Sequence, residues 1–308
     1  MSYRLRHEET LGDGLRRIVC QQIEDAIAAS SEKRNGKSSP VHETRKHLKQ
    51  ARAALRMIAN EVARRHVRRE IRCLRDVARM ISEIRDAEVR LQTVKQLRDF
   101  SSRSKDGNLR ETEELLAFEL DSFLAAFSDW QEEARTKLSR ARDRMARWPL
   151  EDVTCKTLRR AAQRSYKRGR EALRSALRDP TAEEFHTFRK EAKQLWYQLR
   201  ILRPLHPVIL KDLGNQLKEI GQHLGHAHDL AFLAARLRSA GSGRKRSGRV
   251  LGALIEAREE ELQRMAAALG ERFYAQRPRD FGRSISEYFS EWEIAKRRCP
   301  VGAELVAV

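Results

Sequence analysis

The sequence predicts an all-α protein built from two homologous halves. With 35% charged and only 6% aromatic residues, the composition is typical of long amphipathic helices and unlike a sheet protein, in which β-branched and aromatic residues are richer. All seven prolines fall between stretches of helical periodicity, where proline begins or ends a helix without breaking it. An internal repeat, set out below, defines the two halves.

The helices follow from the apolar periodicity between these prolines. We expect them at 10–31, 41–60, 62–82, 84–104, 109–147, 151–177, 181–203, 208–224, 227–240, 249–270 and 279–297. The helix at 109–147 would be about 60 Å long at roughly 1.5 Å per residue, so we expect it to bend, break or bridge two lobes. Segments 31–40 and 240–249 combine Gly, Ser and like charges without apolar periodicity, which predicts two mobile loops, the second the more disordered.

The internal repeat aligns residues 41–58 with residues 185–202 at a constant offset. The matched pairs are His42 with His186, Arg45 with Arg189, Lys46 with Lys190, Lys49 with Lys193, Gln50 with Gln194 and Arg56 with Arg200. A second helix pair also repeats, and it aligns Asp86 with Asp229. We therefore predict two homologous halves, residues 1–150 and 151–308, that pack about a pseudo-two-fold axis within one domain.

Each copy of the repeat carries a basic stripe. On a helical wheel the stripe spans an arc of roughly 120°, with apolar residues on the opposite side. The first stripe contains His42, Arg45, Lys46, Lys49, Arg52 and Arg56, and the second contains His186, Arg189, Lys190, Lys193, Tyr197 and Arg200, with Trp196 in the place of Arg52. The helix after the first stripe carries a similar basic row, formed by Arg65, Arg68, Arg72, Arg75 and Arg79. The corresponding row in the second half is less basic and contains Lys211, Asn215, Lys218 and Gln222.

These stripes and the net charge of +19 indicate a negatively charged partner. Like charges one turn apart repel, so such a helix is destabilised unless a ligand offsets the repulsion. Rows of cations spaced by about 5.4 Å suit a linear series of phosphates, and the amides at the helix starts near His42 and His186 favour an anion as well. A solvated face of a basic protein is the alternative interpretation, and charge alone does not separate nucleic acid, an anionic membrane surface, polyphosphate and acidic proteins.

The two repeat segments, each followed by a helix with Asp before apolar residues (84–91 and 226–233), resemble the signature regions of the CHAD family, the conserved histidine α-helical domain. The segments 3–18 and 165–173 are also similar to that family. The resemblance implies two four-helix bundles around a basic central channel and non-catalytic binding of inorganic polyphosphate, with phosphate or sulfate able to substitute. Because no ExExK motif of the accompanying CYTH-type triphosphatase occurs, we expect a stand-alone member.

The resemblance assigns ligand binding to residues of both halves. It points to His42, Arg45, Lys46, Lys49, Arg52, Arg75, Arg79, His186, Arg189, Lys190, Lys193 and Lys218, and the stripes add Arg56, Arg72, Tyr197 and Arg200. Trp196 in the place of Arg52, and Gln222 in the place of Arg79, predict that the two halves engage the ligand unequally.

The main chemical rival is a metal or phosphohydrolase site formed by His223, His226, His228 and Asp229. On a continuous helix His228 points away from the other two histidines, and no cluster of Asp and Glu completes a hydrolytic metal site. The sequence therefore favours a packing or capping role for His228 and Asp229, and we expect no catalytic residue, metal or cofactor.

Two binding alternatives remain. A nucleic-acid-binding protein is the first, although the sequence has no recognition helix or zinc finger and its basic faces recur in a repeat rather than in a tail. An assembly or granule scaffold that binds protein partners through its amphipathic helices is the second.

The sequence also predicts a cytoplasmic protein. Its four cysteines are scattered without a CxxC pair, which suits a reducing compartment. The first residues do not resemble a signal peptide, and no stretch approaches the ~20 apolar residues of a membrane span. Association with polyphosphate granules is a further hypothesis.

Overall fold

The computed structural model describes residues 3–32, 39–100, 107–126, 130–239 and 246–298, and within these ranges all regular structure is helical. The all-α prediction is therefore confirmed. The helices are α1 (Leu11–Ser31), α2 (Pro40–Leu55), α3 (Arg64–Met80), α4 (Ser82–Phe100), α5 (Gly107–Ala126), α6 (Trp130–Met145), α7 (Cys155–Arg178), α8 (Ala182–Leu202), the 3-10 turn η1 (Arg203–Leu205), α9 (Pro207–Ser239), α10 (Arg246–Phe273) and α11 (Pro278–Arg298). Most of the two predicted mobile loops, 33–38 and 240–245, lies outside the described residues.

Hydroxyl caps begin the helices that position the site. The Ser39 side chain accepts a hydrogen bond from the amide of His42 at 3.0 Å, and Pro40 takes the first position of α2. Thr181 caps α8 in the same way, through the amide of Glu184 at 3.3 Å. The two helices that carry the internal repeat, α2 and α8, which we call the signature helices, therefore each begin at a fixed residue.

Two predictions of helix boundaries were wrong, and a third segment follows one of the outcomes expected for it. The helix expected at 41–60 ends at Leu55, because the amide of Met57 bonds the carbonyl of Ala54 at 2.9 Å and tightens the last turn. The long helix expected at 109–147, for which a break was one expected outcome, is described as two helices, α5 and α6. The two helices expected at 208–224 and 227–240 form the single helix α9: a glycine such as Gly225 costs only about 1 kcal/mol inside a helix, and packing against α8 and α10 outweighs that.

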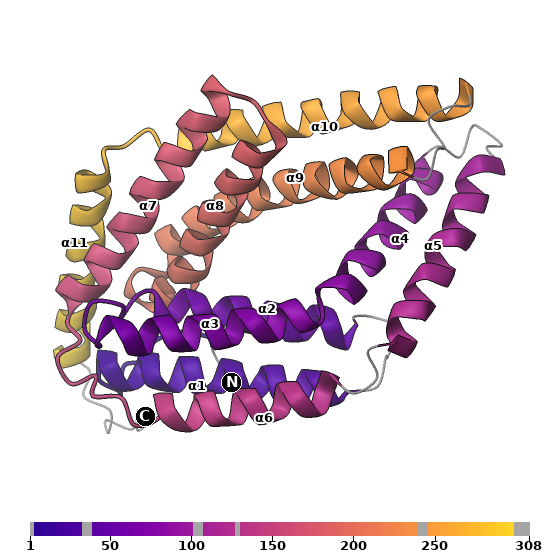
Figure 1. Cartoon of the computed structure of the whole chain (residues 1–308). Coiled ribbons are helices and arrows are strands. Elements are labelled where there is room, and N and C mark those ends of the chain that lie inside the picture. The colour runs from indigo at the N-terminus through magenta and orange to yellow at the C-terminus, as the bar shows by residue number, and fades with distance from the viewer. Residues whose placement is uncertain (1–2, 33–38, 101–106, 127–129, 240–245, 299–308) are drawn as a thin grey trace, which may run out of the picture.

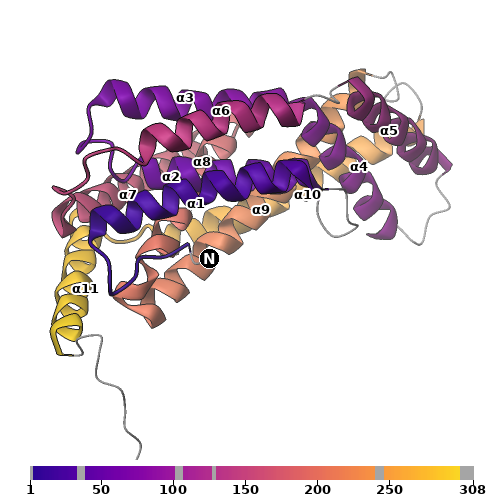
Figure 2. The same ribbon diagram turned by 90° about the horizontal axis from the view of Figure 1, so that it is seen from below.

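The helices form two packed groups and a smaller third one. Helices α1, α2, α3 and α6 lie side by side, and α7 packs between α8 and α11 with α9 against α8 (Figure 1). One apolar core runs through both groups and includes Leu48 of α2 and Phe188 of α8. Helices α4 and α5 leave the first group and pack with α9 and α10 (Figure 2), around a separate small core that includes Val94, Leu116 and Leu233.

Helices α2 and α8 contact each other in the middle of the molecule. The side-chain amide of Gln194 donates to the carbonyl of Ala53 at 3.3 Å, and the Arg56 guanidinium donates to Gln194 Oε1. The segment before α1 joins both helices, because the Tyr3 hydroxyl donates to the Gln50 carbonyl of α2 and the Leu5 amide to the Ile201 carbonyl of α8. The two copies of the repeat thus lie against each other.

Candidate functional site

A pocket of about 410 Å³ lies between α2, α4, α8 and α9. Half of the predicted binding residues line it, four from each signature helix: His42, Arg45, Lys46, Lys49, Arg189, Lys193, Tyr197 and Arg200. A second pocket of about 260 Å³ shares Arg189 and Lys193 with the first and adds Lys218 of α9. The cations of the two repeats therefore face a common space, which we call the basic pocket.

The other predicted residues lie outside this lining. Arg52 and Arg56 continue the α2 row, and the His186 ring packs at a tilt against His228 of the pocket wall, with 4.6 Å between ring centres. Lys190 is exposed on α8. The α3 residues Arg72, Arg75 and Arg79 are exposed as well, and Arg79 lies 3.6 Å from Asp76.

The centre of the basic pocket is electrostatically costly without a ligand. Burial, followed by the charge of Lys193, lowers the pKa of Lys49 from 10.5 to about 7. Burial and then Arg189 lower the pKa of Lys193 to about 8. Taking a charged amine out of water and placing it among other cations disfavours its charged form. An anion in the pocket would reverse that effect.

Several buried donors around the pocket have no hydrogen-bond partner within the described structure. They are Arg52 Nε, Arg189 Nε and His186 Nδ1, the last with its tautomer unassigned. A buried polar atom left without a partner costs on the order of 1–3 kcal/mol. The pocket therefore offers unsatisfied donors to an acceptor-rich ligand.

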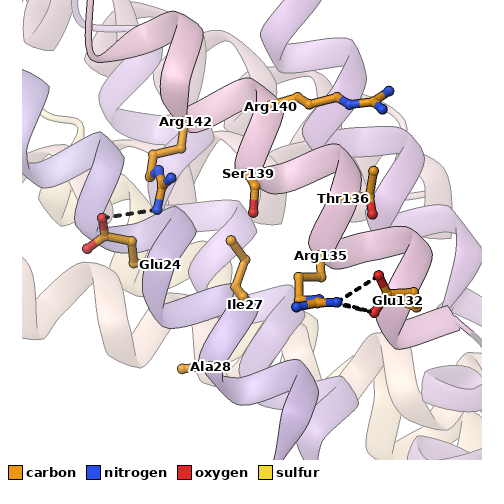
Figure 3. Close-up of a pocket in the computed structure, with 9 residues that line it drawn as sticks. All are labelled: Glu24, Ile27, Ala28, Glu132, Arg135, Thr136, Ser139, Arg140 and Arg142. Atoms are coloured by element: carbon orange, nitrogen blue, oxygen red, sulfur yellow. Dashed lines mark hydrogen bonds and ion pairs between the residues drawn. The ribbon is translucent and has the colours of Figure 1, made fainter.

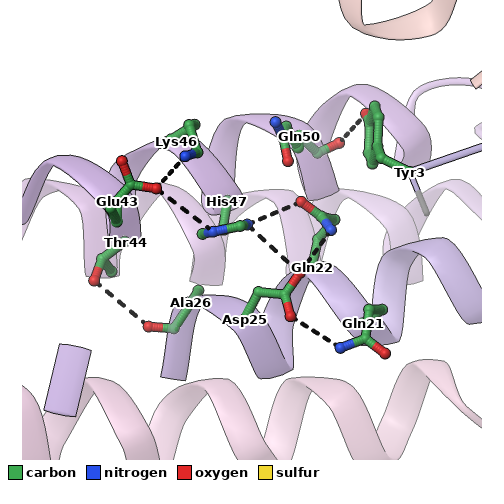
Figure 4. A network of polar contacts seen from close by, with 10 residues as sticks. All are labelled: Tyr3, Gln21, Gln22, Asp25, Ala26, Glu43, Thr44, Lys46, His47 and Gln50. Carbon is green, nitrogen blue, oxygen red and sulfur yellow. Dashed lines mark hydrogen bonds and ion pairs between the residues drawn. The ribbon is translucent and has the colours of Figure 1, made fainter. Parts of the chain in front are cut away.

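Other cations of the pocket are held by the protein itself. Arg45 Nη1 donates to the carbonyl of Ala78 at the end of α3, at 2.6 Å. Lys46 forms an ion pair with Glu43 one turn earlier, within the polar network that joins α1 to α2 (Figure 4). A carboxylate of the same helix thus already engages Lys46, which the helical wheel did not indicate.

The pocket also contains side chains that the sequence analysis did not assign to it. Asp86 of α4 and Asp229 of α9 both line it, as do Arg85 and His228. Burial is the main effect on both carboxyl groups and raises their pKa, while the nearest guanidinium, Arg45 or Arg189, opposes it. The one sequence signal was the alignment of Asp86 with Asp229. His228 packs against His186 and Phe232, as the packing role predicts, and both His228 and Asp229 also face the pocket.

The histidines of the pocket are held neutral. Burial, then the charge of Arg85, lowers the pKa of His42 to about 4, and burial, then Arg189, lowers that of His228 to about 4. The amide of His42 is already bonded to Ser39, so it is not free for an anion as the sequence suggested. Neutral imidazoles leave one donor each for a ligand.

A larger depression of about 480 Å³ between α1 and α6 differs from the basic pocket in how its arginines are paired (Figure 3). Arg135 forms an ion pair with Glu132 at 2.6 Å, and Arg142 lies 3.7 Å from Glu24. Two of its three arginines are therefore paired with carboxylates, which distinguishes it from the basic pocket. Within the described ranges, no group of three or more His, Cys, Asp or Glu side chains is placed to hold a metal ion.

The fold and the pocket define an all-helical protein in which two repeated basic helices line one buried, cation-rich space. The CHAD domain family model matches residues 17–238, and the chain belongs to this family. Among solved structures, the crystal structure of the CHAD domain from the plant Ricinus communis is similar, with a TM-score of 0.62 and 16% identity. The match covers 89% of this chain and 95% of that one, which supports the shared fold. A search of curated proteins finds no match. Among the described helices, none has the length and apolarity needed to cross a membrane.

Proposed function

We propose that the protein binds inorganic polyphosphate in the basic pocket, without catalysis. The observation that carries the proposal is the meeting of Lys49 and Lys193, one from each repeat, in a buried space lined by further cations. Membership of the CHAD family, which is associated with polyphosphate binding, supports the choice of this polyanion.

A chain of phosphates matches the chemistry of the pocket. Each unit carries negative charge and acceptor oxygens, so it neutralises lysines as point charges and accepts forked hydrogen bonds from guanidinium groups. The unsatisfied donors Arg52 Nε and Arg189 Nε are suited to such oxygens. Asp86 and Asp229 keep the charge of the pocket from being purely positive.

The proposal extends to the arrangement of the two halves. We take residues 1–150 and 151–308 as homologous units related by a pseudo-two-fold axis, with α2 and α8 on either side of a central channel.

We also propose that the protein acts in the cytoplasm, in association with polyphosphate granules. Fractionation with granules after cell lysis would test this part.

The direct test compares long-chain polyphosphate with duplex DNA at matched phosphate concentration and ionic strength. We expect tighter binding of polyphosphate, and affinity that falls steeply with salt because counterions are released from the polyanion. Tighter binding of DNA would instead support the nucleic-acid-binding alternative.

Charge-reversal variants test whether the basic pocket is the binding site. Lys49→Glu and Lys193→Glu should each weaken polyphosphate binding by at least about tenfold, since a reversed charge in a buried site repels the ligand. Arg174→Glu, an exposed change on α7 outside both pockets, is the control. Release of orthophosphate during a long incubation would contradict the absence of catalysis.

A further inference from the structure

Helix α3 carries a row of arginines on the surface beyond the basic pocket. Arg68, Arg72, Arg75 and Arg79 follow each other at intervals of three or four residues, so they share one face of the helix. All four are exposed, while the opposite face buries Val67, Glu70, Leu74 and Val77. The row extends for about 16 Å at roughly 1.5 Å per residue. We call it the α3 arginine row.

Most of this row lacks an internal counter-ion. Arg79 lies near Asp76, but no carboxylate lies within ion-pair distance of Arg68, Arg72 or Arg75 among the residues that the structure describes. Surface helices ordinarily mix charges of both signs, because like charges at these spacings destabilise the helix. The uncompensated row therefore indicates an external anion.

The α3 arginine row is connected to the pocket through Arg52. After burial, the charges of Arg56, Arg75 and Arg45 are the largest influences that lower the pKa of Arg52, to about 10. Both a pocket residue, Arg45, and a residue of the row, Arg75, therefore act on Arg52, and Arg45 Nη1 donates directly to the Ala78 carbonyl of α3 at 2.6 Å. The buried Nε of Arg52 has no hydrogen-bond partner in the described structure. The cations of α2 that line the pocket therefore adjoin α3, the helix that carries the row.

The pocket and the row differ in what they can hold. A pocket of about 410 Å³ encloses only a short piece of a linear polymer. A longer chain must leave the pocket, and the cations near it include Lys218 of the second pocket on one side and, on the α2 side, Arg52 and the α3 arginine row. Interactions made by the second part of a tethered ligand form at high effective concentration, so they add affinity only when the chain is long enough to reach them.

We infer that the α3 arginine row binds the continuation of a polyphosphate chain whose first segment occupies the basic pocket, and that it makes the protein selective for long chains. This inference rests on the proposed function. In this inference the pocket binds phosphates from chains of any length, and the α3 arginine row contributes affinity only for long chains.

The test uses the full chain with two probes, tripolyphosphate and long-chain polyphosphate, at equal ionic strength. The α3 variant combines Arg68→Glu with Arg72→Glu. The matched control combines Arg174→Glu with Arg178→Glu, two exposed residues with the same spacing near the end of α7, which changes the net charge equally. Circular dichroism and a thermal melt confirm that both variants are folded.

We expect the α3 variant to bind long chains at least about tenfold more weakly than the control, with a salt slope reduced by roughly 0.7 for each phosphate that the row no longer neutralises. Its affinity for tripolyphosphate should equal that of the control. Equal long-chain affinities in the two variants would overturn the inference, as would an equal loss for both probes. If the wild-type protein bound neither probe, or if Lys49→Glu left both unchanged, the proposed function itself would fail.

Discussion

Arg200 lies against the face of Tyr3, with 5.1 Å between its guanidinium carbon and the ring centre. The same guanidinium carbon lies 5.1 Å from the ring centre of Trp196, so two aromatic rings flank one cation of the basic pocket. The Tyr3 hydroxyl also donates to the Gln50 carbonyl at 2.9 Å. The segment before α1 therefore positions a pocket residue of α8 while it is bonded to α2.

Replacing Tyr3 tests this positioning. Tyr3→Ala removes a buried ring and should lower the free energy of unfolding by about 3 kcal/mol. It should also weaken polyphosphate binding, because Arg200 then rests on Trp196 alone. Tyr3→Phe keeps the ring and removes one hydrogen bond, so we expect a decrease of about 1 kcal/mol in stability and unchanged affinity. Urea unfolding and ligand titration measure the two effects, and equal affinities of the two folded variants would contradict the positioning role.

The lysines at the centre of the pocket predict how stability depends on pH in the absence of ligand. Lys49 and Lys193 have folded-state pKa values of about 7 and about 8, below the ordinary 10.5. Between these values and 10.5 the unfolded chain binds more protons, so the free energy of unfolding should rise as pH increases from about 7 toward 10. Urea unfolding across this range measures the slope.

The variant Lys49→Met isolates the contribution of one lysine. Below pH 7, where Lys49 is charged in the folded protein, the variant should be more stable than the wild type, because it removes a desolvated charge. The difference should shrink as pH rises through the pKa of Lys49. Parallel curves for the two proteins would show that Lys49 is not electrostatically strained.

Binding of a polyanion should be coupled to proton uptake. Negative charge beside Lys49 and Lys193 favours their protonated forms, so ligand binding raises both pKa values and protons enter the site above about pH 7. Affinity should therefore fall from pH 6.5 to 9. Calorimetry in two buffers of different ionisation enthalpy measures the uptake. Lys49→Arg keeps the charge at all pH values, so it should retain affinity and take up fewer protons.

Burial separates two neighbouring lysines of the α8 stripe. Lys193 lines both pockets, whereas Lys190 is exposed and lines neither. A cation in a low-dielectric pocket interacts with a ligand more strongly than one in water. We therefore expect Lys193→Gln to weaken binding about tenfold and Lys190→Gln by less than about twofold at physiological salt. Equal losses would indicate that binding follows net charge instead of the pocket.

Lys190 also shows what the repeat can and cannot predict. Helical periodicity places Lys190 and Lys193 on one arc, and the caps at Ser39 and Thr181 fix where the signature helices begin. Periodicity does not say which residues of that arc the neighbouring helices bury. The burial of each side chain depends on α4 and α9, which cover only part of the stripe.

The residues missed by the sequence analysis share one cause. Asp86 and His228 come from α4 and from the second part of α9, and both enter the pocket because those segments pack together around the small core of Val94 and Leu233. That packing joins residues far apart in the sequence, so no local pattern reports it. The contact of Tyr3 with Arg200 is of the same kind.

Two glycines in helices predict opposite effects of the same substitution. A Cβ at Gly12 of α1 would overlap the carbonyl oxygen of Leu150, which is backbone and has little freedom to move, whereas a Cβ at Gly214 of α9 would meet no atom within 4 Å. Gly12→Ala should therefore force α1 away from the segment before α7 and lower the free energy of unfolding by roughly 1–3 kcal/mol. Gly214→Ala should raise it by up to about 1 kcal/mol, because alanine loses less backbone entropy in a helix. Urea unfolding of both variants measures the difference, and a stabilising Gly12→Ala would mean that α1 is not packed against Leu150 as described.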